Sequence, residues 1–323
     1  MPPAALTLPT SEDVAAARVN IRGFAVRTPL LKLTVDLPGV NIYLKLENLQ
    51  PLGSFKIRPA INVLKSMDIE GLRHGVLTAS AGNFGQGLAF AAREIGVPAT
   101  VVVPEGSAMT KAKALGELGA KVIRLPFEQW WTVLTSRSFS GENGVFIHPV
   151  AESAVIAGNA TIGAEILEDR PDCDTVVVPF GGGGLACGIG SVMRREKPAV
   201  RVIVAESAAA QPAAAALANG RPVQVPHIQS FVDGMGSTTV LQEMWPLIRG
   251  MVDQAACASF AEIVESIRLL AGRHHVIAEA AGAASVAAAL AGRCGNGNII
   301  CIVSGGNIDA PKLGAILNGE SPF

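Results

Sequence analysis

The chain has 323 residues, of which 49% are apolar and 16% charged, and its formal net charge is −1. This length is enough for one large or two medium domains with a sizeable buried core. Because the sequence holds no basic run, it excludes nucleic acid as an expected partner, since phosphate backbones are bound by clustered lysines and arginines.

Strand-like and helix-like segments alternate along most of the chain. The first predicted elements are a helix over residues 12–22 and a strand over residues 41–47. Further strands are expected at residues 75–78, 100–103, 121–125, 144–147, 175–178, 202–205 and 299–303, and helices at residues 60–64, 85–95, 110–118, 155–167 and 263–270. This alternation predicts an α/β protein with parallel sheets covered on both faces. The length favours two such sheets, with a cleft at the strand ends.

Residues 53–60 place a lysine where a strand turns into a helix. A turn at residues 50–53 follows the strand, and Pro59 suits the first turn of the next helix. Lys56 therefore lies at a corner beside Phe55, where a desolvated amine has a lowered pKa and can attack carbonyl groups. Taken alone, this pattern favours a surface lysine, and three later motifs reverse that preference.

The segment Ser80-Ala81-Gly82-Asn83-Phe84 stands between a predicted strand and a predicted helix. Small residues in this position let backbone N–H groups face an anion such as a carboxylate at the helix N-terminus. An ordinary helix cap, which serine and asparagine also favour, explains the segment equally well.

Four successive glycines, Gly181 to Gly184, follow the strand at residues 175–178 and precede Leu185. Their N–H groups form a nest for a phosphate at a helix N-terminus. A dinucleotide is a minor alternative, because Glu206 has near the spacing of a ribose-binding carboxylate. The fingerprint given by Gly181, Gly183 and Ala186 is degenerate, however, and this unit comes late in the chain.

The last motif is Ser304-Gly305-Gly306-Asn307, directly after the predicted strand at residues 299–303. Ser304 is expected at the carboxyl edge of the sheet, where open α/β sheets bind ligands. By itself this motif also suits a polar turn.

The four motifs, in this order, make the chain resemble the fold-type-II pyridoxal-phosphate enzymes, and within them the serine/threonine dehydratases. The resemblance runs from residues 27–30 to 304–307 and includes residues 45–50, 157–159 and 279–283. It implies a tryptophan-synthase-β-like fold of two three-layer αβα domains with mostly parallel sheets. It places a large cofactor-binding domain at residues 1–55 and 152–323 and a small domain at residues 56–151, with the active site in the cleft between them. It also implies a homodimer.

The same resemblance assigns a role to each motif. Lys56 is expected to carry pyridoxal 5'-phosphate covalently and to act as the catalytic base, with Phe55 against the pyridine ring. Asn83 is expected to contact the ring's 3-oxygen, and Ser304 the ring nitrogen. The cofactor phosphate is assigned to Gly181, Gly182, Gly183, Gly184 and Leu185, and the substrate carboxylate to Ser80, Ala81, Gly82, Asn83 and Phe84.

The resemblance implies β-elimination from a β-hydroxy amino acid such as L-threonine or L-serine, giving a 2-oxo acid and ammonia. Ile57 suits the dehydratase branch, and Ala81 lacks the acid/base function of the serine that racemases carry there. Glu206 matches a metal ligand of related enzymes, but Pro212 replaces a second one, so no metal is expected.

Three departures from the family pattern leave the substrate open. Phe84, Pro59 and Asn159 replace more usual residues. A bulkier substrate, such as a β-aryl serine or a hydroxyectoine-derived compound, is therefore an alternative. A β-replacement synthase and a non-catalytic amino-acid sensor are further alternatives.

The remaining sequence features bear on location. No apolar stretch reaches the length of a membrane span, and the first residues lack the pattern of a secretory signal. The five cysteines and five histidines show no paired or ligand-like spacing. These features predict a cytoplasmic protein with no membrane partner.

Overall fold

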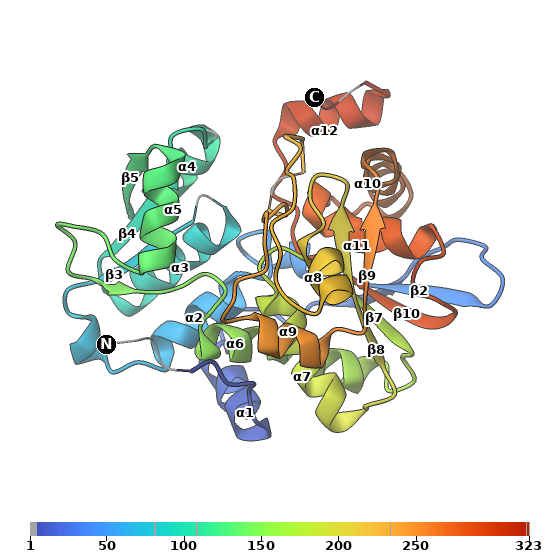
Figure 1. Ribbon diagram of the computed structural model, residues 1–323, viewed down its shortest axis with the longest axis horizontal. Coiled ribbons are helices and arrows are strands. Elements are labelled where there is room, and N and C mark those ends of the chain that lie inside the picture. Colours follow the sequence, from blue (N-terminus) through green and yellow to red (C-terminus); the bar gives the residue numbers. More distant parts are fainter. Residues whose placement is uncertain (1–4, 81, 108, 233, 321, 323) are drawn as a thin grey trace.

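A computed structural model describes residues 5–80, 82–107, 109–232, 234–320 and 322. Its strands form two sheets, which lie side by side in Figure 1. The six-stranded sheet has the order β1-β2-β10-β7-β8-β9, and the four-stranded sheet has the order β5-β4-β3-β6. Only β1 runs antiparallel to its neighbour among these strands. The predicted α/β class with two mostly parallel sheets is therefore confirmed.

The strands have the following bounds. The larger sheet contains β1 (Leu30–Lys32), β2 (Val40–Lys45), β7 (Thr175–Pro179), β8 (Arg201–Ser207), β9 (Gln254–Ala258) and β10 (Gly297–Ile302). The smaller sheet contains β3 (Val76–Ala79), β4 (Ala99–Pro104), β5 (Lys121–Leu125) and β6 (Val145–Phe146).

The helices account for most of the remaining ordered segments. They are α1 (Ser11–Asn20), α2 (Ile57–Lys65), α3 (Asn83–Ile95), α4 (Met109–Glu117), α5 (Phe127–Ser136), α6 (Ser153–Asp169), α7 (Gly184–Glu196), α8 (Pro212–Asn219), α9 (Trp245–Met251), α10 (Phe260–His274), α11 (Ala280–Leu290) and α12 (Ala310–Asn318), with short 3₁₀ turns η1 (Glu47–Leu49) and η2 (Ile69–Leu72). In the described part of the chain, no helix combines the length and apolar character needed to cross a membrane.

Alternate residues of the larger sheet enter two different apolar cores. Val177 and Ile203 face the core that contains α10 and α11. Val176 and Val202 face the opposite core, which contains α6 and α7. This alternation follows from the two-residue period of a strand, and β-branched residues suit a strand that is buried on both faces.

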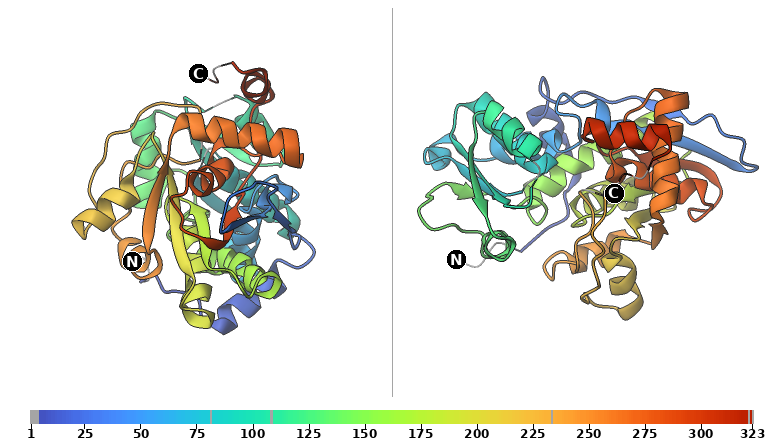
Figure 2. Two further views of the ribbon diagram at one scale, coloured as in Figure 1. Left: turned by 90° about the vertical axis from the view of Figure 1, so that its right-hand side faces the viewer. Right: turned by 90° about the horizontal axis from the view of Figure 1, so that it is seen from above.

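Helix α2 connects the two halves of the molecule, because it packs against α3 of the smaller sheet and against α6. Figure 1 shows α2 and α6 between the two sheets, and the right-hand view in Figure 2, from above, also shows the two halves apart. Gly158 of α6 lies directly under the start of α2. A Cβ atom on Gly158 would be 2.6 Å from the Cα of Pro59, so this crossing has no room for a side chain.

We expect Gly158→Ala to lower the free energy of unfolding by about 1–3 kcal/mol, because backbone atoms of α2 would have to move. Gly272→Ala in α10 is the matched control, since a Cβ there would meet nothing within 4 Å. The control should be neutral or up to about 1 kcal/mol more stable, as expected for glycine replaced in a helix. Urea unfolding measures both, and equal stability of Gly158→Ala and wild type would contradict this packing.

Candidate active site

Lys56 is the residue immediately before α2, and its side chain is partly buried. Residues 52–56, which end with Lys56, are called the lysine loop below, and residues 303–307 are called the serine loop. Backbone hydrogen bonds join the two loops: Phe55 N–H donates to the Ser304 carbonyl at 3.0 Å, and Gly306 N–H donates to the Gly53 carbonyl at 2.8 Å. The structure therefore brings together two predicted site residues, Lys56 and Ser304, from opposite ends of the sequence.

The Lys56 amine has mainly apolar surroundings. Its Nζ lies 4.9 Å from the centre of the Phe55 ring and 5.5 Å from that of Phe84. It donates a long hydrogen bond of 3.4 Å to the Pro149 carbonyl. Burial lowers the pKa of Lys56 to about 8, although the nearby Glu279 carboxylate acts in the opposite direction. A larger fraction of this amine is therefore neutral near pH 8 than of an ordinary lysine.

The N-terminus of α3 is open to an anion. Its cap residue is Gly82, and no side chain caps the helix. Ser80 directly follows β3, with its N–H bonded to the Val102 carbonyl at 3.1 Å. Ala81, which was also predicted to bind substrate, lies outside the described residues. Uncapped N–H groups at the positive end of a helix dipole suit a carboxylate.

Phe84 occupies a different environment from the one expected for a substrate contact. Its side chain is 1% exposed and belongs to the core formed with Ile57 and Ile61 of α2. Because its ring also reaches the Lys56 amine, Phe84 contributes to the apolar surroundings of that amine.

Two of the four residues in the glycine loop, residues 181–184, have no space for a side chain. A Cβ on Gly182 would be 2.6 Å from Val150 Cγ2, and one on Gly183 would be 2.7 Å from Ile248 Cδ1. Gly183 also has a φ of +91°, a conformation that disfavours residues with a Cβ, and it caps α7 without a side-chain partner. Leu185 follows in the first turn of α7, with its side chain buried in the core. The loop therefore fits a phosphate group, which requires close approach to backbone N–H groups.

Asn83 lies beside two polar residues that were not predicted as site residues. Asn83 Nδ2 donates to Glu279 Oε1 at 2.8 Å, and Asn83 Oδ1 accepts from Asn307 Nδ2 at 2.8 Å. Ser304 is only 3% exposed and lies two residues after the end of β10. Glu279 belongs to the stretch 279–283 and Asn307 to the stretch 304–307, both of which carry the family resemblance, so their motifs were the available signal.

His148 is another residue near the site that the sequence patterns did not indicate. Its Nδ1 accepts the backbone N–H groups of Val150 at 3.1 Å and Ala151 at 2.8 Å. The side chain is 3% exposed, and burial, with Arg137 and Lys56 nearby, lowers the pKa of His148 to about 3. A neutral His148 thus fixes a turn that contacts Lys56 through Pro149 and packs Val150 against Gly182.

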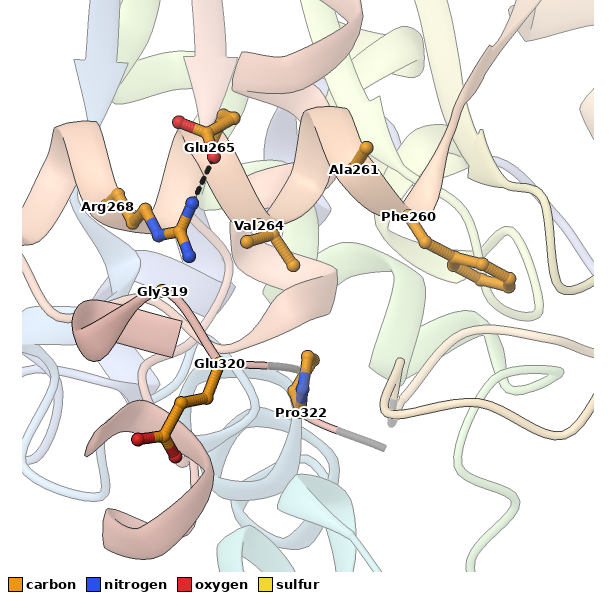
Figure 3. Close-up of a pocket in the computed structure, with 8 residues that line it drawn as sticks. All are labelled: Phe260, Ala261, Val264, Glu265, Arg268, Gly319, Glu320 and Pro322. Carbon is orange, nitrogen blue, oxygen red and sulfur yellow. Dashed lines mark hydrogen bonds and ion pairs between the residues drawn. The ribbon is translucent and has the colours of Figure 1, made fainter. Parts of the chain in front are cut away.

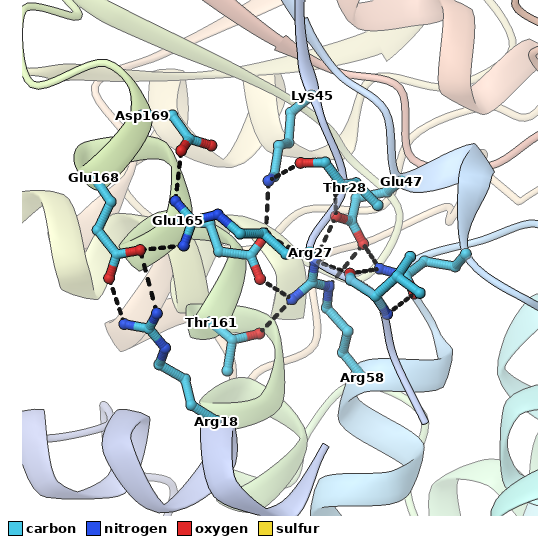
Figure 4. Close-up of polar contacts among 12 residues, drawn as sticks. Arg18, Arg27, Thr28, Lys45, Glu47, Arg58, Thr161, Glu165, Glu168 and Asp169 are labelled. Carbon is cyan, nitrogen blue, oxygen red and sulfur yellow. Dashed lines mark hydrogen bonds and ion pairs between the residues drawn. The ribbon is translucent and has the colours of Figure 1, made fainter. Parts of the chain in front are cut away.

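A buried network of charges anchors the helix that follows Lys56 (Figure 4). Arg58 donates from Nε to Glu47 at 2.8 Å and from Nη1 to Glu165 at 2.6 Å. Lys45 Nζ also donates to Glu165 at 2.6 Å. The two cations and two carboxylates balance each other, which is required of charges removed from water. The start of α2 is thereby tied to β2, η1 and α6.

Glu206 does not face the glycine loop as a ribose-binding carboxylate would. Its two oxygens accept the N–H groups of Ala213 at 2.7 Å and Ala214 at 2.9 Å, so it caps the start of α8. Burial raises the pKa of Glu206 to about 7. Within the described ranges, no group of three or more His, Cys, Asp or Glu residues could hold a metal ion; the absence of a required metal stays a prediction.

A surface groove lies away from these motifs, between α10 and the C-terminal residues (Figure 3). Its lining includes Val264, Arg268 and Pro322. The Arg268 guanidinium is already bonded to the Ile316 carbonyl and to Glu265. None of the predicted site residues lines this groove, so it is not a candidate for the active site.

Comparison with known proteins decides which family this arrangement represents. The family model described as pyridoxal-phosphate dependent enzyme matches residues 21–305. The chain belongs to this family. The protein is thus an enzyme that uses pyridoxal phosphate, and the predicted family, fold and cofactor are confirmed.

Individual relatives place the chain near the threonine dehydratases. L-threonine ammonia-lyase of Geobacter sulfurreducens is 40% identical over 292 residues, which are 86% of this chain and 70% of the relative. L-threonine ammonia-lyase of Thermotoga maritima is 38% identical, covering 96% of this chain and 78% of the relative. Among solved structures, maize serine racemase has a TM-score of 0.88 and 29% identity, with 98% of each chain covered. The threonine deaminase of T.th. has a TM-score of 0.86 and 31% identity, covering 93% of this chain and 99% of that one.

The neutral state of His148 gives a prediction for pH dependence. Because its pKa is about 3 when folded and about 6.5 when unfolded, the unfolded chain binds more protons between these values. Relative to His148→Asn, wild type should lose up to about 1.4 kcal/mol of stability per pH unit as pH falls below about 6.5. Urea unfolding of both proteins between pH 7.5 and 4.5 measures this difference.

The comparison with the variant removes the contribution of groups common to both proteins. Glu206 is one such group. Because its pKa is raised in the folded protein, Glu206 makes the protein more stable as pH falls, over a pH range that overlaps that of His148. Parallel stability profiles of wild type and His148→Asn would contradict a neutral, buried imidazole at this position.

Proposed function

We propose that the enzyme converts a β-hydroxy amino acid, such as L-threonine or L-serine, to a 2-oxo acid and ammonia by β-elimination. The observation that carries this proposal is the Lys56 amine, which is partly buried between two aromatic rings and has a pKa lowered to about 8. An amine in this state can form a covalent bond to a carbonyl group and can later accept a proton from carbon.

The surrounding motifs divide the binding tasks. Gly181 to Gly184, with the backbone of Leu185, would hold the cofactor phosphate, and Phe55 would lie against its ring. Asn83 and Ser304 would contact the ring's polar atoms. Bound pyridoxal phosphate would supply an electron-withdrawing ring that stabilises negative charge on the substrate's α-carbon.

The substrate carboxylate would lie at the open N-terminus of α3, near Ser80, Gly82 and Asn83. Lys56 would remove the proton from the α-carbon, and the hydroxyl group on the β-carbon would leave as water. The released enamine then takes up water and gives the 2-oxo acid and ammonia. A hydroxyl-bearing neighbour such as Ser304 does not carry the negative charge that would stabilise a protonated ring nitrogen, which favours elimination over transamination.

We also propose the domain limits that go with this site. Residues 1–55 and 152–323 would form the large cofactor-binding domain around the six-stranded sheet, and residues 56–151 the small domain around the four-stranded sheet. The cleft between them would hold the substrate.

The similarity to serine racemases suggests racemisation as a second candidate activity. Racemisation requires a proton donor on each face of the α-carbon. Ala81 stands in the sequence where this role needs an acid or base, and a methyl group cannot supply a proton. We therefore rank elimination first, and chiral chromatography of recovered serine separates the two activities.

We expect Lys56→Ala to lower the release of 2-oxo acid by roughly 10²–10⁴-fold or more, because it removes the general base. It should also remove the visible absorbance of lysine-bound cofactor. Lys65→Ala, an exposed lysine near the end of the same helix, is the matched control and should retain both. Wild-type rates in Lys56→Ala would exclude the proposed role.

Other outcomes of this assay select the alternatives. Release of a 2-oxo acid only from a β-aryl serine or another bulky β-hydroxy amino acid would change the substrate and keep the reaction. Product formation only with an added thiol would indicate a β-replacement synthase. Amino-acid binding without turnover would indicate a sensor.

The glycine loop gives a separate prediction for cofactor binding. Gly183→Ala should weaken pyridoxal phosphate binding roughly 5- to 30-fold, since a Cβ in the left-handed conformation costs about 1–2 kcal/mol. The added Cβ would also lie 2.7 Å from Ile248 Cδ1. Absorbance titration of protein freed of cofactor measures the change, with Gly250→Ala in α9 as the control, where a Cβ meets nothing within 4 Å. Unchanged affinity in Gly183→Ala would argue against a phosphate in this loop.

A further inference from the structure

Asn307 lies in the serine loop, between β10 and α12, and both hydrogens of its side-chain amide are used. Its Nδ2 donates to the carbonyl of Leu52 at 2.9 Å and to Oδ1 of Asn83 at 2.8 Å. Leu52 belongs to the lysine loop, whereas Asn83 is the first residue of α3. One amide nitrogen therefore joins the segment that carries Lys56 to the helix that borders the proposed carboxylate site.

The contact with Asn307 also decides which way the Asn83 amide faces. The nitrogen of Asn307 can only donate, so the atom of Asn83 that faces it must be the oxygen. The nitrogen of Asn83 then faces the other side, where it donates to Glu279 Oε1 at 2.8 Å. The Glu279 carboxylate that accepts this bond also acts to raise the pKa of Lys56, so the N–H side of the Asn83 amide faces a group that affects the lysine.

Close backbone packing holds Asn307 in this position. A Cβ on Gly53 would collide with Asn307 Oδ1, and a Cβ on Gly305 would collide with Glu279 Oε1. Gly306 is equally confined, because its Cβ would be 2.5 Å from the Ile277 carbonyl. The serine loop therefore cannot move relative to Leu52, Asn83 and Glu279 without breaking several contacts at once.

We propose that Asn307 is a positioning residue that fixes the orientation of the Asn83 amide and ties the N-terminus of α3 to the lysine loop. The proposal rests on the proposed function where it concerns catalysis, because Asn83 is assigned there to the cofactor and substrate. The mechanical tie between α3 and the lysine loop does not depend on that function. The test below therefore measures the two parts separately.

The first experiment follows backbone amide hydrogen exchange in the full chain, with and without added pyridoxal phosphate. Asn307→Asp keeps the shape of the side chain but removes both donors, and Asn307→Ala removes them without adding charge. Both variants should exchange roughly tenfold faster at residues 52–56 and in the first turn of α3, as expected when hydrogen bonds of ordinary strength are lost. Asn318→Asp, at an exposed position in α12, is the matched control and should exchange like wild type.

The second experiment reverses the direction of the hydrogen bonds. In Asn307→Asp, Asn83 can satisfy the new carboxylate only by turning its nitrogen toward it, which leaves its oxygen against the Glu279 carboxylate. Adding Glu279→Gln supplies a donor to that oxygen. The double variant therefore restores both hydrogen bonds of Asn83, to residues 307 and 279, with the Asn83 amide flipped. Its net charge equals that of wild type, and Glu279→Gln alone is the reference in which Asn83 keeps its orientation.

If Asn307 acts by orienting Asn83, the double variant regains wild-type exchange in the first turn of α3. Exchange at residues 52–56 stays fast, since the Leu52 carbonyl has no donor in either variant. The kcat/KM of the double variant for release of 2-oxo acid remains roughly tenfold or more below that of Glu279→Gln. The affinity of the double variant for pyridoxal phosphate is lower as well.

Two results would overturn the proposal. Wild-type exchange in Asn307→Asp and Asn307→Ala would show that Asn307 does not tie α3 to the lysine loop. Equal kcat/KM and equal cofactor affinity in the double variant and Glu279→Gln would show that the orientation of Asn83 has no effect. If wild type releases no 2-oxo acid, the proposed function fails, and hydrogen exchange and cofactor affinity still decide for or against Asn307.

Discussion

Two backbone hydrogen bonds, from Phe55 to Ser304 and from Gly306 to Gly53, join the lysine loop to the serine loop. Backbone atoms make these bonds, so they set the separation of Lys56 and Ser304 without depending on flexible side chains. The glycines on either side have no Cβ, which allows the two loops to approach each other this closely. The Asn307 contacts to Leu52 and Asn83 depend on this pairing, because Asn307 belongs to the serine loop.

The sequence predicted those parts of the site whose function depends on one short segment of the chain. Four adjacent glycines after a strand indicate an anion site because the exposed N–H groups belong to the same loop. His148 and Glu279 escaped prediction because their roles arise between segments far apart in the chain. Lys56 meets Pro149 across 93 residues, and Asn83 meets Glu279 across 196. No local pattern of residues records such a contact.

The fold shows the same division between local and tertiary information. Strand β7 was predicted because its run of β-branched residues is typical of a buried strand. Helix α11 was not, since its sequence AAGAASVAAAL is small and apolar all round and has no helical periodicity. Strand β9, with the sequence QAACA, likewise lacks β-branched residues. For both segments the surrounding core decides the structure.

The position of β10 in the sheet has a consequence for synthesis of the chain. This strand is the last in the sequence, yet it lies between β2 and β7. Until residues 297–302 have left the ribosome, β2 has no parallel neighbour and the lysine loop has no serine loop to pair with. The contacts that complete the site span most of the sequence, which is the kind of topology that folds late and slowly. A growing chain therefore carries Lys56 for most of its synthesis without the serine loop that completes its site.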